Sequence, residues 1–339
     1  MIAPANDGDA APLPFRYLDA YLAPLLPTLG RADVTDIFVN RPGELWIETL
    51  GGGLERHDAP ELDEVRLWRL ARQIASLSHQ GISREHPLLS ATLPDGARVQ
   101  IVAPPATRGP MALAIRKHVV ADMKLADYHA NGAFLGTRVG QEQPPEPFVD
   151  FATLGADGLG TALASAVRAR KNILVAGGTS TGKTTFLNAL IKEIPPAERL
   201  ILIEDTPELK LNHANAIGLI AVKGETGEAR VSADDLLQAS LRMRPDRIIL
   251  GELRGAEAYT FLRAVNTGHP GSLTTIHADS PEGAVEQLAL IILQSGVQLR
   301  RADIIDYVDN VVDVFVQLER HEGRRVISRI SARDSLGSR

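Results

Sequence analysis

The segment GGTSTGKTT, residues 177–185, constrains the fold of this chain more than any other stretch. It follows the apolar run NILVA and precedes TTFLNALIKEI, which has helical character. Gly-x4-Gly-Lys-Thr between a strand and a helix is the P-loop pattern, in which glycines let backbone N–H groups surround a polyphosphate. The helix N-terminus adds partial positive charge. A chance Gly-rich turn is the alternative, but the flanking elements favour a phosphate-binding loop.

The residues of this loop have separate expected tasks. Lys183 is expected to reach the β- and γ-phosphates, and the Thr184 hydroxyl is expected to ligate Mg²⁺. The predicted phosphate-binding residues are Gly177, Gly178, Thr179, Ser180, Thr181, Gly182, Lys183, Thr184 and Thr185.

The chain around the loop divides into two patterns. From residue 157 onward, short apolar runs alternate with helical segments, which is typical of a mostly parallel α/β sheet. Before that, the β-rich runs at 34–40, 44–49 and 111–117 and a strand–turn–strand at 88–105 predict a small α+β domain with an antiparallel sheet. The expected ranges are a disordered leader at 1–13, an N-terminal α+β domain at 14–120, a linker at 121–155, a P-loop domain at 156–332 and a tail at 333–339.

Composition excludes several classes of protein. The chain has no cysteine, so disulfides and Cys-ligated zinc or iron–sulfur sites are excluded. Lys plus Arg number 36 against 42 Asp plus Glu, a net charge of −6, which disfavours direct nucleic-acid binding. No apolar run approaches the roughly 20 residues of a membrane span. The leader lacks the positive start of a signal peptide, so we expect a cytoplasmic protein.

A carboxylate, Glu252, stands at the end of the apolar run RIILGE. A solvated acid after a strand is common. In P-loop proteins, however, an acid at the carboxyl end of a neighbouring strand faces the phosphates and the metal. We therefore predict that Glu252 polarises a water or holds Mg²⁺, directly or through a metal-bound water.

A second acidic group follows the run LILIE and comprises Glu204, Asp205 and Glu208. A Pro-containing turn with capping or solvated acids is the alternative reading. Carboxylates beside an apolar strand in a P-loop sheet favour a metal–water site, with Glu204 and Glu208 ahead of Asp205.

Two histidines flank the apolar run SLTTI. His277, at its end, is predicted to sense the γ-phosphate and relay its loss to the next element. His269 lies in a Gly/Pro turn. We expect it to be a turn residue that makes an interface or sensor contact.

Taken together, these motifs resemble those of a known family. GGTSTGKTT, LILIEDTPEL, LRMRPDRIILGELRGAEAY and TGHPGSLTTIHADSP are similar to the Walker A motif, acidic box, Walker B motif and His box of secretion traffic ATPases. VTDIFVNRPGELWIE, LPDGARVQIVAPP and AIRKHVVADMKLADY resemble the N-terminal domain of the type IV secretion branch. The type II relatives typically carry a tetracysteine zinc module, which a chain without cysteine lacks.

The resemblance implies a RecA-like C-terminal domain, ATP as the nucleotide with Mg²⁺, and assembly into a homohexameric ring. It also implies arginines that stabilise charge on the transferred phosphoryl group. By motif position these are Arg98 and Arg116 from the N-terminal domain and Arg244 across a subunit boundary. Without the resemblance, each reads as a solvated surface residue.

The expected function is ATP hydrolysis that powers substrate export or pilus biogenesis by a type IV secretion system. The implied partners are other secretion ATPases and inner-membrane channel subunits, with membrane association through them at the cytoplasmic face of the inner membrane. A type IV pilus assembly or retraction motor and a type II secretion motor are alternatives within the superfamily. A RecA-like nucleic-acid motor and a nucleotide-gated scaffold are alternatives of other classes.

Overall fold

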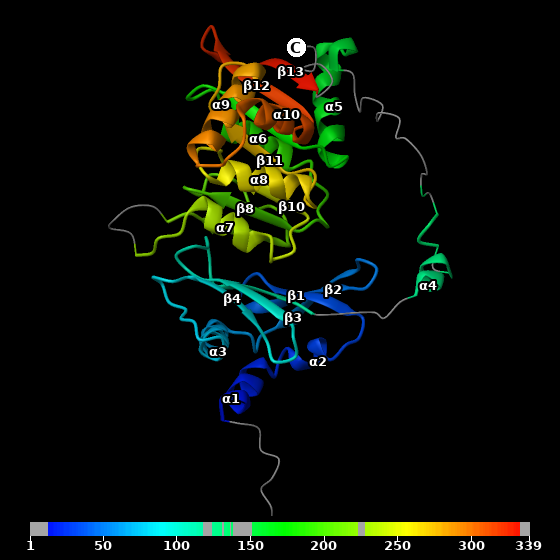
Figure 1. The fold of residues 1–339 in the computed structure, drawn as a ribbon, viewed down its shortest axis with the longest axis vertical. Helices are drawn as coiled ribbons and strands as arrows, with labels where there is room; N and C mark the ends of the chain where they lie inside the picture. The colour runs from blue at the N-terminus through cyan, green and yellow to red at the C-terminus, as the bar shows by residue number, and fades with distance from the viewer. Residues whose placement is uncertain are drawn as a thin grey trace, which may run out of the picture. The chain divides into compact units, whose positions relative to one another are not determined.

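The computed structural model describes residues 13–117, 124–130, 132–135, 137, 151–222 and 228–332 (Figure 1). The expected leader, apart from Leu13, and the expected tail lie outside these residues. The chain forms two compact units. The first comprises Met1–Lys117 with Pro195–His269, and the second comprises His118–Ile194 with Pro270–Arg339. The domain ranges expected from the sequence stay predictions.

The N-terminal part of the first unit contains a six-stranded antiparallel sheet in the order β3-β2-β1-β6-β5-β4. Its strands are β1 (Val34–Val39), β2 (Gly43–Thr49), β3 (Leu54–Ala59), β4 (Leu88–Thr92), β5 (Arg98–Val102) and β6 (Ala112–Arg116). The sequence predicts all of these except β3. That edge strand is exposed at three of its six residues and reads LERHDA, so it lacks an apolar period.

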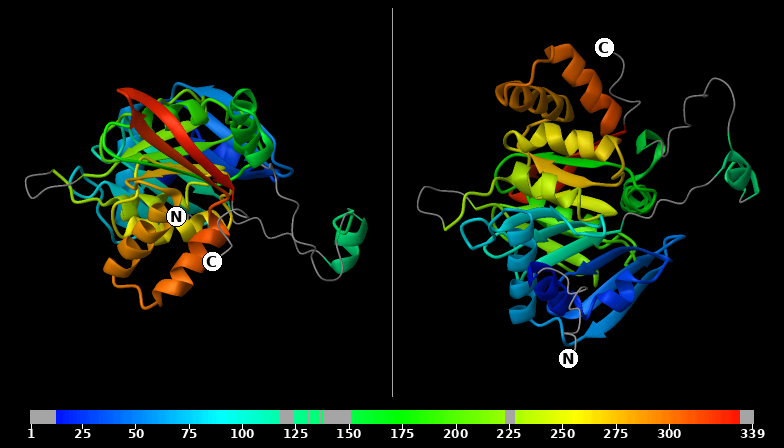
Figure 2. Two further views of the ribbon diagram at one scale, coloured as in Figure 1. Left: turned by 90° about the horizontal axis from the view of Figure 1, so that it is seen from above. Right: turned by 60° about the horizontal axis from the view of Figure 1, so that its bottom comes forward.

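Helices cover one face of this sheet. They are α1 (Leu13–Leu22), α2 (Leu26–Leu29) and α3 (Glu64–Leu77), and α1 and α3 lie side by side (Figure 2). Asp63 starts α3 by accepting a hydrogen bond from the Arg66 amide at 2.7 Å. Because side chains alternate across a strand, Ile37, Ile47 and Ile115 pack into the helix-covered core, and the residues between them face the opposite side.

The remainder of the first unit has three parallel strands in the order β10-β8-β9. They are β8 (Leu200–Glu204), β9 (Ala216–Ile220) and β10 (Arg247–Leu250), with helices α7 (Ala233–Ser240) and α8 (Glu257–Asn266). The N-terminal part joins them at the edge, where Thr107 forms an antiparallel bridge with Leu219 of β9.

The second unit carries the phosphate loop. Its strands follow the order β13-β12-β7-β11, with β11, β7 and β12 parallel and β13 antiparallel to β12. Its strands and helices are α4 (Leu125–Ala130), α5 (Ala156–Arg168), β7 (Ile173–Gly177), α6 (Lys183–Ile191), β11 (Leu273–Ile276), α9 (Pro281–Gln294), α10 (Arg301–Val311), β12 (Val314–His321) and β13 (Arg324–Ala332), with a 3-10 turn at Phe151–Thr153.

These elements confirm the predicted fold class. The chain is α/β, with an antiparallel sheet near the N-terminus and mostly parallel strands in the C-terminal part. Among the described residues, no helix combines the length and the apolar character that crossing a membrane requires.

Candidate nucleotide-binding site

The phosphate loop begins where β7 ends and closes at the first residue of α6. Ser180 and Gly182 adopt positive φ angles of 61° and 96°, which turn the chain through the loop and into the helix. No side chain caps the N-terminus of α6. A helix N-terminus whose N-cap residue is a glycine offers no competing side-chain acceptor, which suits a site for an anion.

The Lys183 side chain folds back under the loop and is 8% exposed. Its Nζ donates hydrogen bonds to the carbonyl oxygens of Gly177 and Gly178, at 2.9 and 3.1 Å. Thr181 Oγ1 donates to the same Gly178 carbonyl at 2.9 Å. Of the other predicted loop residues, Thr179, Ser180 and Thr185 are exposed and Thr184 is half-buried.

His277 lies beside Lys183. Lys183 Nζ is 3.3 Å from His277 Nδ1 and 3.5 Å from Nε2. The histidine follows the C-terminal end of β11, and β11 pairs in parallel with β7, so both strands deliver their C-terminal ends to one edge. The structure thus brings together two residues that the sequence separates by 94 positions.

Close packing explains the loop glycines. A Cβ on Gly177 would lie 2.6 Å from Thr181 Oγ1 and 2.8 Å from the Leu318 carbonyl oxygen. A Cβ on Gly182 would lie 3.1 Å from Cδ of Arg325, an exposed residue of β13. Sequence reasoning missed Arg325 because the β12–β13 hairpin carries no phosphate-binding motif.

In the first unit, the acidic residues gather at the C-terminal ends of β8 and β10. Glu204 is 6% exposed, and its Oε1 accepts hydrogen bonds from the amides of Glu208 and Leu209 at 2.9 and 2.8 Å. Its Oε2 forms an ion pair with Arg108. Both oxygens of Glu204 therefore have partners, and the carboxylates of Asp205 and Glu208 are the exposed ones.

Glu252 follows β10 and forms an ion pair with Arg254. Arg254 Nε donates to Glu252 Oε2 at 2.6 Å, and Arg254 Nη1 lies 3.5 Å from Asp205 Oδ2. The hydrogen bond that Arg254 donates to Glu252 raises the pKa of Arg254. The two acidic segments predicted from the sequence are thus joined by one arginine. Sequence reasoning missed Arg254, although its position two residues after Glu252 was a signal.

Arg98 and Arg116 occupy one row of charged residues across the N-terminal sheet. In the register of the sheet, Arg98 lies opposite Arg116, Arg116 opposite Asp36, and Asp36 opposite Glu48, so the row crosses four adjacent strands. This row faces away from the core under α1 and α3. Both arginines are exposed, and burial raises the pKa values of Asp36 and Glu48.

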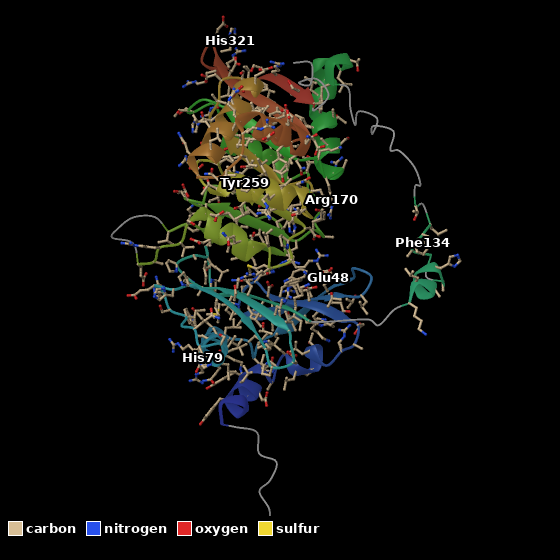
Figure 3. The ribbon with its side chains drawn as sticks, in the orientation of Figure 1. Glu48, His79, Phe134, Arg170, Tyr259 and His321 are labelled. Carbon is tan, nitrogen blue, oxygen red and sulfur yellow. The ribbon has the colours of Figure 1, made fainter. Side chains whose placement is uncertain are left out.

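Arg244 meets the same row from the other part of the unit. Its Nη2 donates to Oε1 of Glu48 (labelled in Figure 3) at 2.5 Å, and its Nη1 donates to Asp246 Oδ1 at 2.8 Å. Arg244 adopts φ of 57°, an uncommon conformation for a residue with a side chain. In this structure its guanidinium is engaged within its own chain.

His269 is a half-buried turn residue. Its Nδ1 lies 3.0 Å from the Pro245 carbonyl oxygen, and burial lowers its pKa. This contact joins the turn after α8 to the segment before β10. It is local to the first unit.

Comparison with known proteins decides the family. The family described as type II/IV secretion system protein matches residues 20–312. The chain belongs to this family. The resemblance drawn from the motifs is confirmed.

Individual members of the type II/IV secretion family match over nearly the whole chain. The type IV secretion system protein PtlH of Bordetella pertussis is 41% identical, covering 97% of this chain and 98% of its own length. The VirB11 protein of Bartonella quintana is 38% identical, covering 91% of each. The crystal structure of the VirB11 ATPase from the Brucella suis type IV secretion system, in complex with sulphate, has a TM-score of 0.84 at 38% identity and covers 94% of this chain and 95% of that one.

Proposed function

We propose that this chain is an ATPase of a type IV secretion system, and that it hydrolyses ATP at residues 177–185 with Mg²⁺. The arrangement of Lys183 carries the proposal. A buried ammonium beneath a loop that ends at an uncapped helix N-terminus suits a bound polyphosphate. The names of the relatives, which include a VirB11 ATPase, support the same activity.

The loop residues bind and orient the nucleotide. Lys183 exchanges its bonds to the Gly177 and Gly178 carbonyls for bonds to the β- and γ-phosphates. Thr184 and Glu252 would hold Mg²⁺, directly or through water, and a bound ion would neutralise phosphate charge. The Thr184 hydroxyl and the Glu252 carboxylate both offer oxygen atoms, which are the ligands that magnesium prefers.

The carboxylates orient the attacking water. Glu252 and Glu208 accept its proton or hold it in line with the γ-phosphate, and Glu204 belongs to the same acidic group. His277, which contacts Lys183 Nζ, is the residue that senses loss of the γ-phosphate. Both the lysine and the histidine then respond to the same event.

Arginines complete the site in an assembled ring. Arg98 and Arg116 are exposed on one face of the N-terminal sheet, which suits them to bind phosphate oxygens. Arg244 is proposed to act across a subunit boundary, a role that requires its ion pairs with Glu48 and Asp246 to open. The ring is a homohexamer that docks on other secretion ATPases and inner-membrane channel subunits at the cytoplasmic face of the membrane.

ATP turnover of Lys183→Ala tests the activity. We expect a loss of at least about 100-fold in kcat/KM, because the ammonium contacts the transferred phosphate. Lys192→Ala removes an exposed lysine at the end of the same helix and provides the matched control. If Lys183→Ala turns over ATP as fast as Lys192→Ala, the assignment is wrong.

The mass of the particle in solution tests the ring. Light scattering with and without ATP and Mg²⁺ is expected to give six protomers in at least the nucleotide-bound state. A monomer under both conditions at micromolar concentration would contradict the proposed assembly.

A further inference from the structure

Arg108 lies in the connection between β5 and β6, outside every motif considered so far. Its side chain is 14% exposed, and its guanidinium pairs with Glu204, whose side chain is 4% exposed. Arg108 Nη1 also donates to the Leu209 carbonyl oxygen at 2.6 Å. One half-buried arginine thus binds both the first and the last residue of the acidic segment at 204–209.

The backbone on both sides holds Arg108 in place. The Arg108 amide donates to the Gly218 carbonyl at 2.9 Å, and the Ile220 amide donates to the Ala106 carbonyl at 2.9 Å. With the Thr107–Leu219 bridge, this segment adds a short antiparallel partner to the edge of β9. The residue therefore belongs to an ordered extension of the sheet.

Gly218 makes room for the arginine side chain. A Cβ at this position would lie 2.5 Å from Arg108 Cδ and 2.7 Å from its Nε. Only a glycine lets the side chain cross β9 toward Glu204. The close approach also means that Arg108 can be displaced by a substitution that leaves its charge intact.

Glu204 transmits the contact to the acidic segment. Its Oε1 accepts hydrogen bonds from the amides of Glu208 and Leu209, while its Oε2 forms an ion pair with Arg108. The bonds fix the main chain that carries the Asp205 and Glu208 carboxylates. The Glu204 carboxylate is engaged by a guanidinium and two amides, so it supports the segment, whereas the exposed Glu208 carboxylate can face the solvent.

We propose that Arg108 is a positioning residue for ATP hydrolysis, which acts through Glu204 to hold the acidic segment in its working conformation. Glu204 is then part of the support and Glu208 is the carboxylate that it positions. The inference rests on the proposed function, since it names which residues of that same site orient the chemistry.

Hydrogen exchange tests the positioning without reference to activity. In Arg108→Met we expect the amides of Glu208 and Leu209 to exchange roughly fivefold faster or more, with β8 still protected. Arg84→Met is the matched control, because Arg84 is another arginine of the first 117 residues that pairs with a carboxylate from 195–269, Glu228, at the surface. Unchanged exchange at the two amides would overturn the proposal.

Turnover tests the consequence. Arg108→Met is expected to lower kcat about tenfold, with ADP affinity within about threefold of wild type, because orientation and not binding is lost. Glu204→Gln combined with Arg108→Met should lower kcat little more than either change alone. If the two reductions in kcat multiply in the double variant, or if kcat of Arg108→Met stays within twofold of wild type, the inference is overturned.

Gly218→Ala tests the same contact if Arg108→Met fails to fold. It displaces the arginine and should lower kcat in the same direction, whereas Gly109→Ala adds a methyl group in open space and should not. Normal kcat in Gly218→Ala would count against the proposal. If Lys183→Ala retains turnover, the proposed function fails by itself, and the exchange experiment still decides whether Arg108 holds the acidic segment.

Discussion

Lys183 Nζ lies 3.3 Å from Nδ1 of His277, so the lysine of the phosphate loop and the histidine after β11 contact each other directly. We expect a phosphate bound at the loop to compete with the histidine for the ammonium group. The proposed roles of the two residues can therefore be tested together.

Replacing His277 is expected to impair turnover more than binding. His277→Ala should lower kcat by about tenfold or more and change ADP affinity by less than about threefold, because Lys183 and the loop amides remain. Steady-state kinetics and ADP titration measure both effects. His321→Ala, at the exposed tip of the β12–β13 hairpin, is the control (Figure 3). Equal kcat in the two variants would remove His277 from the mechanism.

Replacing Glu252 is expected to separate binding from hydrolysis. Glu252→Gln keeps the shape of the side chain and loses its charge, so kcat should fall by about 100-fold or more while ATP still binds. Turnover and ATP titration report the two quantities. Glu319→Gln removes an exposed carboxylate of β12 and should behave as wild type. A Glu252→Gln protein with normal kcat would contradict the proposed role.

Arg199 is expected to dominate the stability of the first unit. It is 2% exposed, lies 4.0 Å from the Phe38 ring centroid and donates to Asn40, Asn215 and the Met243 carbonyl. Arg199→Met should lower the free energy of unfolding by about 3 kcal/mol or more, because the Met243 carbonyl and Asn40 Oδ1 lose their Arg199 donor and Asn215 Oδ1 keeps only its bond from Asn40 Nδ2. Urea unfolding measures the loss.

The control for Arg199 is Arg300→Ala. Arg300 is 84% exposed and pairs only locally with Asp303 among the ion pairs seen here. We expect its removal to leave the free energy of unfolding nearly unchanged, because a solvated surface ion pair contributes little to stability. Similar costs for both variants would show that the buried network contributes no more than a surface pair.

His269 predicts a pH dependence of stability. Burial lowers its pKa below the ordinary value of 6.5, so the folded protein binds fewer protons at this site than the unfolded chain. Its contribution is complete above pH 6.5 and is lost as the pH falls toward the folded pKa, by at most about 1.4 kcal/mol per pH unit.

Urea unfolding at pH 7.5 and 5.5 checks this sign. Wild type should lose more stability on acidification than His269→Asn, which keeps an amide donor for the Pro245 carbonyl and does not titrate. The other histidines are the same in both proteins, so their contributions to the loss of stability cancel when the two losses are subtracted. An equal loss in both would show that His269 contributes nothing to the acid response.

Local sequence determined the phosphate loop and most strands of the two sheets. The loop depends on Gly177 and Gly182 and on the residues between β7 and α6. All of these residues are close together in the sequence. The hairpin and strand signals near the N-terminus are equally local, since they rest on alternation and turn residues. The edge strand β3 was not predicted, because an exposed edge strand needs no apolar period.

Only the tertiary structure decided how the charged residues pair. Arg244 and Glu48 are 196 positions apart, and Arg108 and Leu209 are 101 apart, so no spacing rule relates them. The sequence identified Glu204 as an acid beside a strand, but the fold surrounds it with a guanidinium and two amides. The chemistry of a carboxylate depends on such partners, because burial and hydrogen bonds determine whether it supports a loop or accepts a proton. The motifs identified the family, and the packing determined which partner each of these acids and arginines contacts.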